Sequence, residues 1–246
     1  MSKVIRGLRA FSALLNLSKW PSFYYTWEKT RFDRHFKVSF SQDGEDLALL
    51  FLVSQSPGRY LDIGAHHPDR FSNTRMLYDR GWRGVNVEAN PNLIREFQKK
   101  RPEDLTLNVC VGTKHKYTFT IFDEPAISTV NLDWKKKFLE LKYTVDSEIE
   151  IQGISLYELI TEHFASGDLT LLLIDAEGSD FDILMSGDFG RLPLALHPEW
   201  ILVETSLPVL SALQESSVKY LVENQYEPIL VLPRATVLRK KSVTSI

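Results

Sequence analysis

RYLDIGAHHP at residues 59–68 and GVNVEAN at residues 84–90 decide the fold of this chain. In the first stretch a short apolar run ends at Gly64, and in the second an apolar run ends at Glu88. A helix-like segment lies between them. A glycine at the end of one strand and an acid at the end of the next are the layout of a nucleotide-type site at the carboxyl edge of a parallel sheet.

The turn after the first strand reads GAHHPD at residues 64–69 and argues against a dinucleotide. A dehydrogenase would need G-x-G-x-x-G there, because several glycines let the backbone cradle a pyrophosphate. S-adenosylmethionine carries a ribose but no phosphate, so it suits a turn with one glycine. Its ribose hydroxyls would donate hydrogen bonds to the acid at Glu88. The two strands therefore predict a methyl-donor site.

Length and composition fit a globular α/β protein. The chain has 246 residues, of which 43% are hydrophobic and 25% charged. Its single cysteine, Cys110, excludes a disulfide framework and any cysteine-rich metal site. Cys110 lies in the apolar run LNVCV, which predicts a buried strand thiol rather than a nucleophile. No apolar run is long enough for a spanning helix and no cleavable signal pattern is present, so we expect a cytoplasmic location.

The charge is unevenly distributed, which predicts a division into an N-terminal segment, residues 1–40, and a main domain, residues 41–246. The segment carries a net charge of +6, whereas the rest of the chain carries −9. The acidic domain lacks the clustered Lys and Arg of a nucleic-acid surface. Apolar residues at helical spacing, with aromatic residues after them, predict an amphipathic helix in the segment. The helix could pack on its own domain or on a second copy in a homodimer, which is the commoner use of such a face, or lie on an anionic membrane surface as a peripheral contact.

Apolar runs alternate with helical patterns over most of the chain. This alternation predicts an α/β fold with a mostly parallel sheet of seven strands and an antiparallel terminal strand. Residues 112–160 interrupt it with alternating segments, which we interpret as an insertion of antiparallel strands after strand three. Asn90 begins a helix that Pro102 ends, and the basic residues 99–101 in its last turn would complement its dipole. The predicted strands are 59–63, 84–88, 105–111, 169–175, 200–204, 227–232 and 235–240, and the main helices are 43–54, 72–80, 90–101, 180–186 and 209–223.

Five segments in register resemble the FkbM family of methyltransferases. They are SQDGEDLALL (41–50), YLDIGAHHP (60–68), SNTRMLYDRGWRGVNVEANP (72–91), LLIDAEGSDFDIL (172–184) and ILVE (201–204). The resemblance implies a class I methyltransferase (Rossmann-like) fold, S-adenosylmethionine as donor, and transfer to oxygen, often a sugar hydroxyl of a glycan or glycosylated metabolite. The family often has a lysine where this chain has Leu173, so a role for such a lysine is not expected here.

The candidate donor-binding residues follow the first two strands. Asp62, Gly64 and Ala65 would lie against the methionine half of the donor, and Glu88 would bind the ribose. An acid buried beside a strand end is costly unless it is paired, which favours a ligand for Asp62. Two further candidates have equally good structural explanations as helix-start residues, Gln42 and Asn73. The remaining donor-binding candidates are Ala89 and Cys110.

The candidate catalytic residues are Asp175, Glu177 and His66. A sugar hydroxyl is a weak acid, so a base or a bound cation must take its proton as the new bond forms. Asp175 with Glu204, at the end of the neighbouring strand, could instead hold Mg²⁺ or Mn²⁺. We favour the metal-free version.

The predicted function is O-methylation of a saccharide acceptor, such as a surface glycan, a nucleotide sugar or a glycosylated metabolite. Alternatives are N-methylation of a small molecule and a non-catalytic protein that retains the fold. Retained strand-end acids argue against the last.

Overall fold

The computed structural model describes residues 38–53 and 56–242. A compact unit begins at Ser39. Most of the N-terminal segment lies outside the described residues, so a membrane or dimer contact through residues 1–40 stays a prediction. Within the described ranges no helix combines the length and apolar character needed to cross a bilayer.

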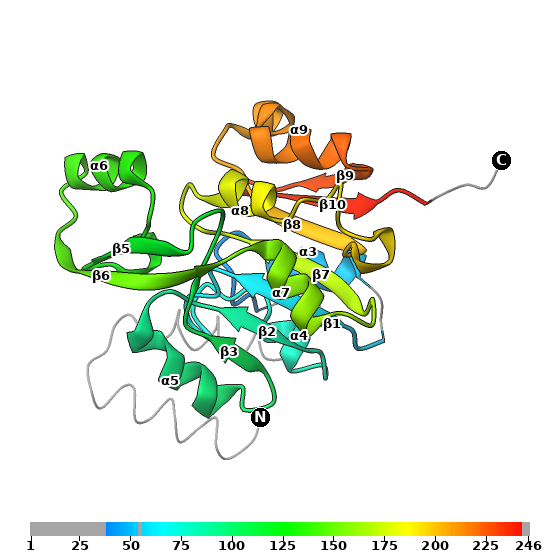
Figure 1. Ribbon diagram of the computed structural model, residues 1–246, viewed down its shortest axis with the longest axis horizontal. Helices are drawn as coiled ribbons and strands as arrows, with labels where there is room; N and C mark the ends of the chain where they lie inside the picture. The colour runs from blue at the N-terminus through cyan, green and yellow to red at the C-terminus, as the bar shows by residue number, and fades with distance from the viewer. Residues whose placement is uncertain (1–37, 54–55, 243–246) are drawn as a thin grey trace, which may run out of the picture. The chain divides into compact units, whose positions relative to one another are not determined.

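The main sheet has seven strands in the order β3-β2-β1-β7-β8-β10-β9 (Figure 1). Neighbours from β3 to β8 are parallel, and β10 runs antiparallel to both β8 and β9. The predicted seven-stranded, mostly parallel sheet with a reversed terminal strand is therefore confirmed. The strands are β1 (Arg59–Ile63), β2 (Arg83–Val87), β3 (Leu105–Leu107), β7 (Leu169–Ile174), β8 (Trp200–Glu204), β9 (Tyr226–Val231) and β10 (Ala235–Lys240).

The direction of strand addition reverses between β1 and β7, and this position defines where a ligand can enter. From β1 the chain continues to β2 and β3 on one side, whereas β7 and β8 lie on the other. Ile63 is in register with Val87 of β2 and with Ile174 of β7. The residues that follow these three therefore emerge at one edge, where open α/β sheets bind their ligands.

Both faces of the main sheet are covered, which explains why β7 is a continuous apolar run. Alternate residues of β7 enter two different cores: Leu172 packs on the face covered by α7, α8 and α9, and Leu173 on the face covered by α3 and α4. The α-helices are α3 (Glu45–Leu52), α4 (Arg75–Tyr78), α5 (Pro91–Lys100), α6 (Leu132–Glu140), α7 (Leu156–His163), α8 (Asp180–Ser186) and α9 (Ser216–Glu223), with 3₁₀ turns at Pro125–Ile127, Leu194–Leu196 and Val209–Gln214.

The predicted insertion is a small second sheet of β4 (Cys110–Val111), β5 (Lys116–Phe122) and β6 (Val145–Ile154), in the order β4-β6-β5. Figure 1 shows this sheet and α6, in green, beside the main sheet. The prediction of one strand over 105–111 was wrong, because the run divides into β3 and β4. Between them the Asn108 side chain donates to the backbone oxygens of Glu88 and Ala89, at 2.9 and 3.0 Å, so the chain leaves the main sheet here.

The helices differ from the predictions mainly at their starts. Asn90 caps α5 as predicted, accepting from the Asn92 N–H at 3.0 Å. The helix expected from Ser72 begins only at Arg75. Helix α7 was missed, although Ser155 and Glu158 form a capping box at its start. The helix predicted over 209–223 is interrupted at Glu215, whose backbone is extended.

Candidate functional site

A cavity of about 360 Å³ lies at the carboxyl ends of β1, β7 and β8. It contains most of the predicted site residues. The wall also includes α6 of the insertion and the loop between β9 and β10. Its lining includes the predicted residues Gln42, Asp62, Gly64, Ala65, His66, Asn73, Asp175, Glu177 and Glu204.

A second, smaller pocket of about 80 Å³ adjoins the cavity, with which it shares Gly64, His66, Asp175 and Glu177. The remaining predicted donor residues line this pocket, namely Glu88, Ala89 and Cys110. Every candidate residue therefore lines one of two connected spaces. The division into an apolar-walled small pocket and a polar large one could not be deduced from the sequence.

Glu88 is the polar centre of the small pocket. Its side chain is buried, and its two carboxylate oxygens accept from the backbone N–H groups of His66 at 2.7 Å and Asn90 at 2.6 Å. Burial raises the pKa of Glu88 to about 7, against the lowering effect of these hydrogen bonds. The acid thus joins the turn after β1 to the start of α5 and still offers lone pairs to a ligand.

Gly64 allows the turn after β1 to pass over the end of β7. Its φ of +80° lies in the left-handed region, and a Cβ there would stand 1.8 Å from the Asp175 carbonyl oxygen. The N–H groups of Gly64 and Ala65 both donate to the Val87 oxygen, at 3.0 and 3.1 Å. The structure therefore requires glycine here for the close approach to β7, while the predicted approach of this turn to a ligand stays a prediction.

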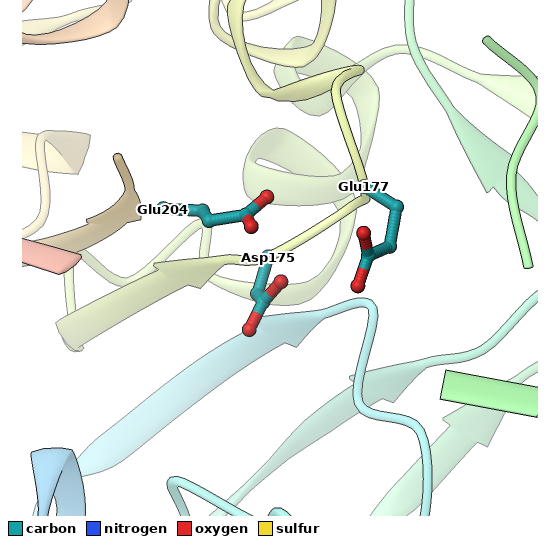
Figure 2. Close-up of side chains that lie close together, drawn as sticks. All are labelled: Asp175, Glu177 and Glu204. Carbon is teal, nitrogen blue, oxygen red and sulfur yellow. The ribbon is translucent and has the colours of Figure 1, made fainter. Parts of the chain in front are cut away.

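Three carboxylates meet where the two spaces join. Asp175, Glu177 and Glu204 each offer an oxygen within 4.8 Å of the others. Figure 2 shows the three side chains extending into one space from the end of β7, the turn after it and the end of β8. Burial and, after it, the charges of the neighbouring acids raise the pKa of Asp175 to about 7 and that of Glu177 to about 8. The pKa of Glu204 is raised well above its usual range for the same two reasons.

The loop that carries Glu177 is fixed by the insertion. Glu177 has a φ of 48°, unusual for a residue with a side chain, and Gly178 follows at 87°. Thr129 donates to the Glu177 oxygen at 2.9 Å, and Asn131 donates to the Gly178 oxygen at 2.7 Å. The indole of Trp134 packs where a Gly178 side chain would be. These contacts hold the strained backbone so that the Glu177 side chain lines the cavity.

The two histidines of the turn have different surroundings. His66 lines both spaces, but burial and the nearby Arg70 lower the pKa of its imidazole to about 4. His67 lines neither space, and its Nδ1 accepts from the N–H groups of Asp69 and Arg70 at 3.1 and 3.0 Å. Near neutral pH an imidazole with a pKa of about 4 is a weak base, so the carboxylates are better placed to accept a proton.

Several lining residues were not predicted. Trp134, Lys137 and Phe138 come from α6, and Arg234 from the loop after β9. Lys137 holds its ammonium 4.0 Å from the Trp134 ring centroid, and Arg234 forms an ion pair with Asp43 at 2.7 Å. The aromatic and basic pattern of α6 was visible in the sequence, but nothing local indicated which face would meet the cavity.

The carboxylate group also has the chemistry of a site for a hard divalent ion, which prefers oxygen ligands. Three oxygens within 4.8 Å could share one ion. The raised pKa values of these acids reflect first their burial and then the repulsion between them.

We predict that Glu204→Gln stabilises the protein at alkaline pH. An acid whose pKa is raised on folding makes the free energy of unfolding fall as pH rises from the unfolded pKa, about 4, towards the raised pKa of Glu204 in the folded protein. Within the described residues the Glu204 carboxylate has no hydrogen bond to lose. Thermal unfolding of the variant and of the wild type is compared in EDTA at pH 5 and pH 8. At pH 8 the variant should have a Tm at least about 2 °C above that of the wild type, since a change of about 1 kcal/mol in the free energy of unfolding shifts Tm by about 2–4 °C in a chain of this size. The exposed Glu223→Gln serves as control, and a lower Tm at pH 8 for Glu204→Gln would contradict the prediction.

Methyltransferases of low sequence identity are among the solved structures similar to this chain. An FkbM methyltransferase from Methylobacillus flagellatus has 11% identity and a TM-score of 0.45 over 81% of this chain and 48% of that one, so this chain spans about half its length. A precorrin-6y C5,15-methyltransferase from Geobacter metallireducens has 14% identity and a TM-score of 0.42 over 80% and 87%. A 1,6-didemethyltoxoflavin-N1-methyltransferase from Burkholderia thailandensis, solved with S-adenosylhomocysteine, has 10% identity and a TM-score of 0.39 over 95% and 90%.

No curated protein matches the chain in sequence. The sequence model of the methyltransferase FkbM domain, in contrast, matches residues 62–217. This range runs from Asp62 to the start of α9 and contains both pockets' strand-end acids. With the observed strand order, the match gives the fold as that of class I methyltransferases. The chain therefore belongs to the family of proteins with a methyltransferase FkbM domain.

Proposed function

We propose that this protein is an S-adenosylmethionine-dependent O-methyltransferase whose acceptor is a hydroxyl of a saccharide. The observation that carries the proposal is the position of the carboxylates Asp175 and Glu177, which line both connected spaces. One space has the features of a donor site, and the other is large enough for a polar acceptor. A proton acceptor at their junction is what transfer to a hydroxyl requires.

The residues present fit the donor. Glu88 lies in a small pocket whose other walls are mostly apolar, including Val109, Cys110 and Phe119. This combination suits a ribose attached to a flat, weakly polar base. Asp62, which lines the larger cavity, suits the donor's ammonium group. When bound, S-adenosylmethionine supplies a methyl group on a positively charged sulfur.

The protein's own contribution to the chemistry is alignment and proton removal. The cavity holds the acceptor beside the donor pocket, and such alignment supplies much of the rate in a displacement reaction. Asp175 or Glu177 then accepts the hydroxyl proton. A pKa of about 7 for Asp175 and about 8 for Glu177 means that one of the pair is ionised near neutral pH while remaining basic enough to take a proton.

N-methylation of a small amine is a second candidate, and one observation favours it. Phe71, Trp134 and Phe138 all line the cavity together with the carboxylates. Aromatic rings beside acids form a favourable site for a cationic amine. A saccharide can use the same groups, with its hydroxyls on the carboxylates and an apolar face on a ring. Identification of the acceptor is therefore needed to distinguish O-methylation from N-methylation.

A methyl-transfer screen distinguishes the two candidates. The full-length protein with S-adenosylmethionine should methylate members of a panel of nucleotide sugars and surface-glycan fragments, and leave a matched panel of small amines unmodified. Mass spectrometry of the products locates the methyl group on oxygen or nitrogen. Transfer only to amines would replace the saccharide proposal with the second candidate.

Donor binding can be tested without any acceptor. We expect Glu88→Gln to weaken the affinity for S-adenosylmethionine by about tenfold to a hundredfold, since hydrogen bonds to a charged group contribute about 1.5–3 kcal/mol. A neutral amide also cannot accept from both backbone N–H groups as the carboxylate does. Calorimetric titration measures the change, with Glu223→Gln as the exposed control. An unchanged dissociation constant would remove Glu88 from the donor site.

Asp175→Asn tests the proton acceptor. We expect nearly intact donor binding and a turnover lower by about a hundredfold or more, the range for loss of a general base. The exposed Asp146→Asn is the matched control.

Chelator treatment separates a base from a metal site. Unchanged wild-type activity after dialysis against EDTA is expected for a base. Activity lost in EDTA and restored by Mg²⁺ or Mn²⁺ would support an ion at Asp175 and Glu204. Full activity of Asp175→Asn would contradict both versions.

A further inference from the structure

A fully buried arginine lies behind the larger cavity, outside its lining residues. Arg101 directly follows α5, where its sequence position suggested a solvated charge at a helix end, but the structure buries it completely. Its guanidinium lies 5.4 Å from the Phe97 ring centroid and 5.7 Å from that of Tyr78. Within the described residues Arg101 forms no direct ion pair. A buried charge without a direct counter-charge is costly, so its hydrogen bonds need an explanation.

All the polar partners of the guanidinium belong to the segment between β1 and α4. Nη1 donates to the Thr74 hydroxyl at 2.7 Å, and Nη2 donates to the Ser72 hydroxyl at 2.6 Å and to the Pro68 carbonyl. Ser72 and Thr74 are themselves buried. Arg101 therefore holds the segment that leads from the glycine turn to the first helix after it.

Thr74 connects this arginine to the cavity. Its hydroxyl also donates to the Asp62 carboxylate, with 2.7 Å between Thr74 Oγ1 and Asp62 Oδ2. Arginine has only donors, so the Thr74 oxygen must accept from it, and the single Thr74 proton is directed to Asp62. The two hydrogen bonds therefore donate in the same direction, from Arg101 to Thr74 and from Thr74 to Asp62, and the last acceptor is the Asp62 carboxylate.

Thr74 and Arg101 oppose the other influences on Asp62. The pKa of Asp62 is raised to about 6: burial and the charge of Asp104 raise it, and the Thr74 hydrogen bond and the Arg101 charge oppose them. Without the latter two groups, a carboxyl at this position would be neutral over more of the physiological range. Asp62 lines the larger cavity, so its charge is available to a ligand.

We propose that Arg101 and Thr74 are positioning residues that hold Asp62 ionised and oriented to bind the ammonium group of the methyl donor. The inference rests on the proposed function, because it assumes a donor with a cationic amino group. The inference goes beyond the proposed function by assigning a role to two residues that line neither the larger cavity nor the small pocket. It also predicts which of their contacts affect donor binding.

The test is calorimetric titration of full-length variants with S-adenosylhomocysteine, which has the same amino-acid end as the donor. Thr74→Val keeps the shape but loses the hydroxyl, and its dissociation constant should rise by about fivefold to tenfold, the effect of one or two hydrogen bonds. Thr74→Ser keeps the hydroxyl and should bind like the wild type. Thr236→Val is the matched control, because the buried Thr236 hydroxyl has no hydrogen-bond partner among the residues that the structure describes.

Two further variants separate a role through Asp62 from simple loop stabilisation. Ser72→Ala removes another Arg101 contact without touching the hydrogen bonds that lead to Asp62, so it should bind within about twofold of the wild type. In an Asp62→Asn background, Thr74→Val should cause no further loss, since its effect passes through that carboxylate. Equal losses for Ser72→Ala and Thr74→Val, or an undiminished Thr74→Val effect in Asp62→Asn, would overturn the proposal.

The wild type separates this inference from the proposed function. If wild-type protein does not bind S-adenosylhomocysteine, the proposed function fails. If it binds and Thr74→Val binds equally well, only the positioning role fails. Should Thr74→Val not fold, Arg101→Lys replaces it, because lysine keeps the charge but cannot reach Thr74 and Ser72 together with a rigid fork. Unchanged affinity of Arg101→Lys would then contradict the inference.

Discussion

Gly64 lies so close to the end of β7 that any side chain there would collide with the Asp175 carbonyl. This contact places the turn after β1 directly over the start of the loop after β7. The Asp175 N–H donates in return to the Ile63 oxygen at 3.1 Å. Because the two strand ends cannot separate, Asp62 and Asp175 are held at one edge, and Glu88 joins them through its hydrogen bond to the His66 backbone. The larger cavity and the small pocket both form beside this close approach of the Gly64 turn to the end of β7.

The same geometry places several acidic side chains together at one largely buried edge of the sheet. Several acids at one sheet edge, each partly removed from water, repel one another and disfavour ionisation. Hydrogen-bond donors stabilise the charge on some of these acids and not on others. Glu88 receives two backbone N–H groups, and Asp62 receives the Thr74 hydroxyl backed by Arg101, whereas Asp175 and Glu204 have no side-chain hydrogen bonds within the described residues. The pKa values of both groups are raised by burial, so the difference lies in the hydrogen bonds: donors orient Glu88 and Asp62, whereas the lone pairs of Asp175 and Glu204 are left to accept a proton or a ligand.

Features encoded within a short stretch of sequence were predictable. The strands at 59–63 and 200–204 were predicted to the residue because apolar runs of that length have few alternatives in an alternating chain. The strand-end candidates line the pockets because parallel strands deliver their last residues to one edge. Helix α7 could also have been found, since its capping box is a local signal. Its omission reflects the interpretation of residues 112–160 as an insertion of antiparallel strands, in which the only helix-like segment that we identified was DWKKKFLELK at 133–142.

Features that depend on distant contacts were not predictable. Nothing near Arg101 in sequence indicates burial; its partners lie 27 to 33 residues earlier, as the separations to Thr74 and Pro68 show. The break between β3 and β4 depends on Asn108 reaching the chain near Glu88. The orientation of α6 is likewise set by Asn131 and Trp134 meeting the loop at Gly178.

These differences explain why the sequence indicates the donor better than the acceptor. The acids of the small pocket follow the ends of adjacent parallel strands, where the sequence pattern places them, although part of its apolar wall comes from β4 and β5. The acceptor cavity takes one wall from the insertion, through Trp134 and Lys137, and another from Arg234 near the end of the chain. Its shape depends on how the insertion is joined to the Glu177 loop by Thr129 and Asn131. Small changes in those contacts would move an aromatic wall relative to fixed carboxylates. Variation in α6 and in the loop that carries Arg234, which line the larger cavity and not the small pocket, is therefore a direct physical route by which proteins with this fold can change the shape of the larger cavity.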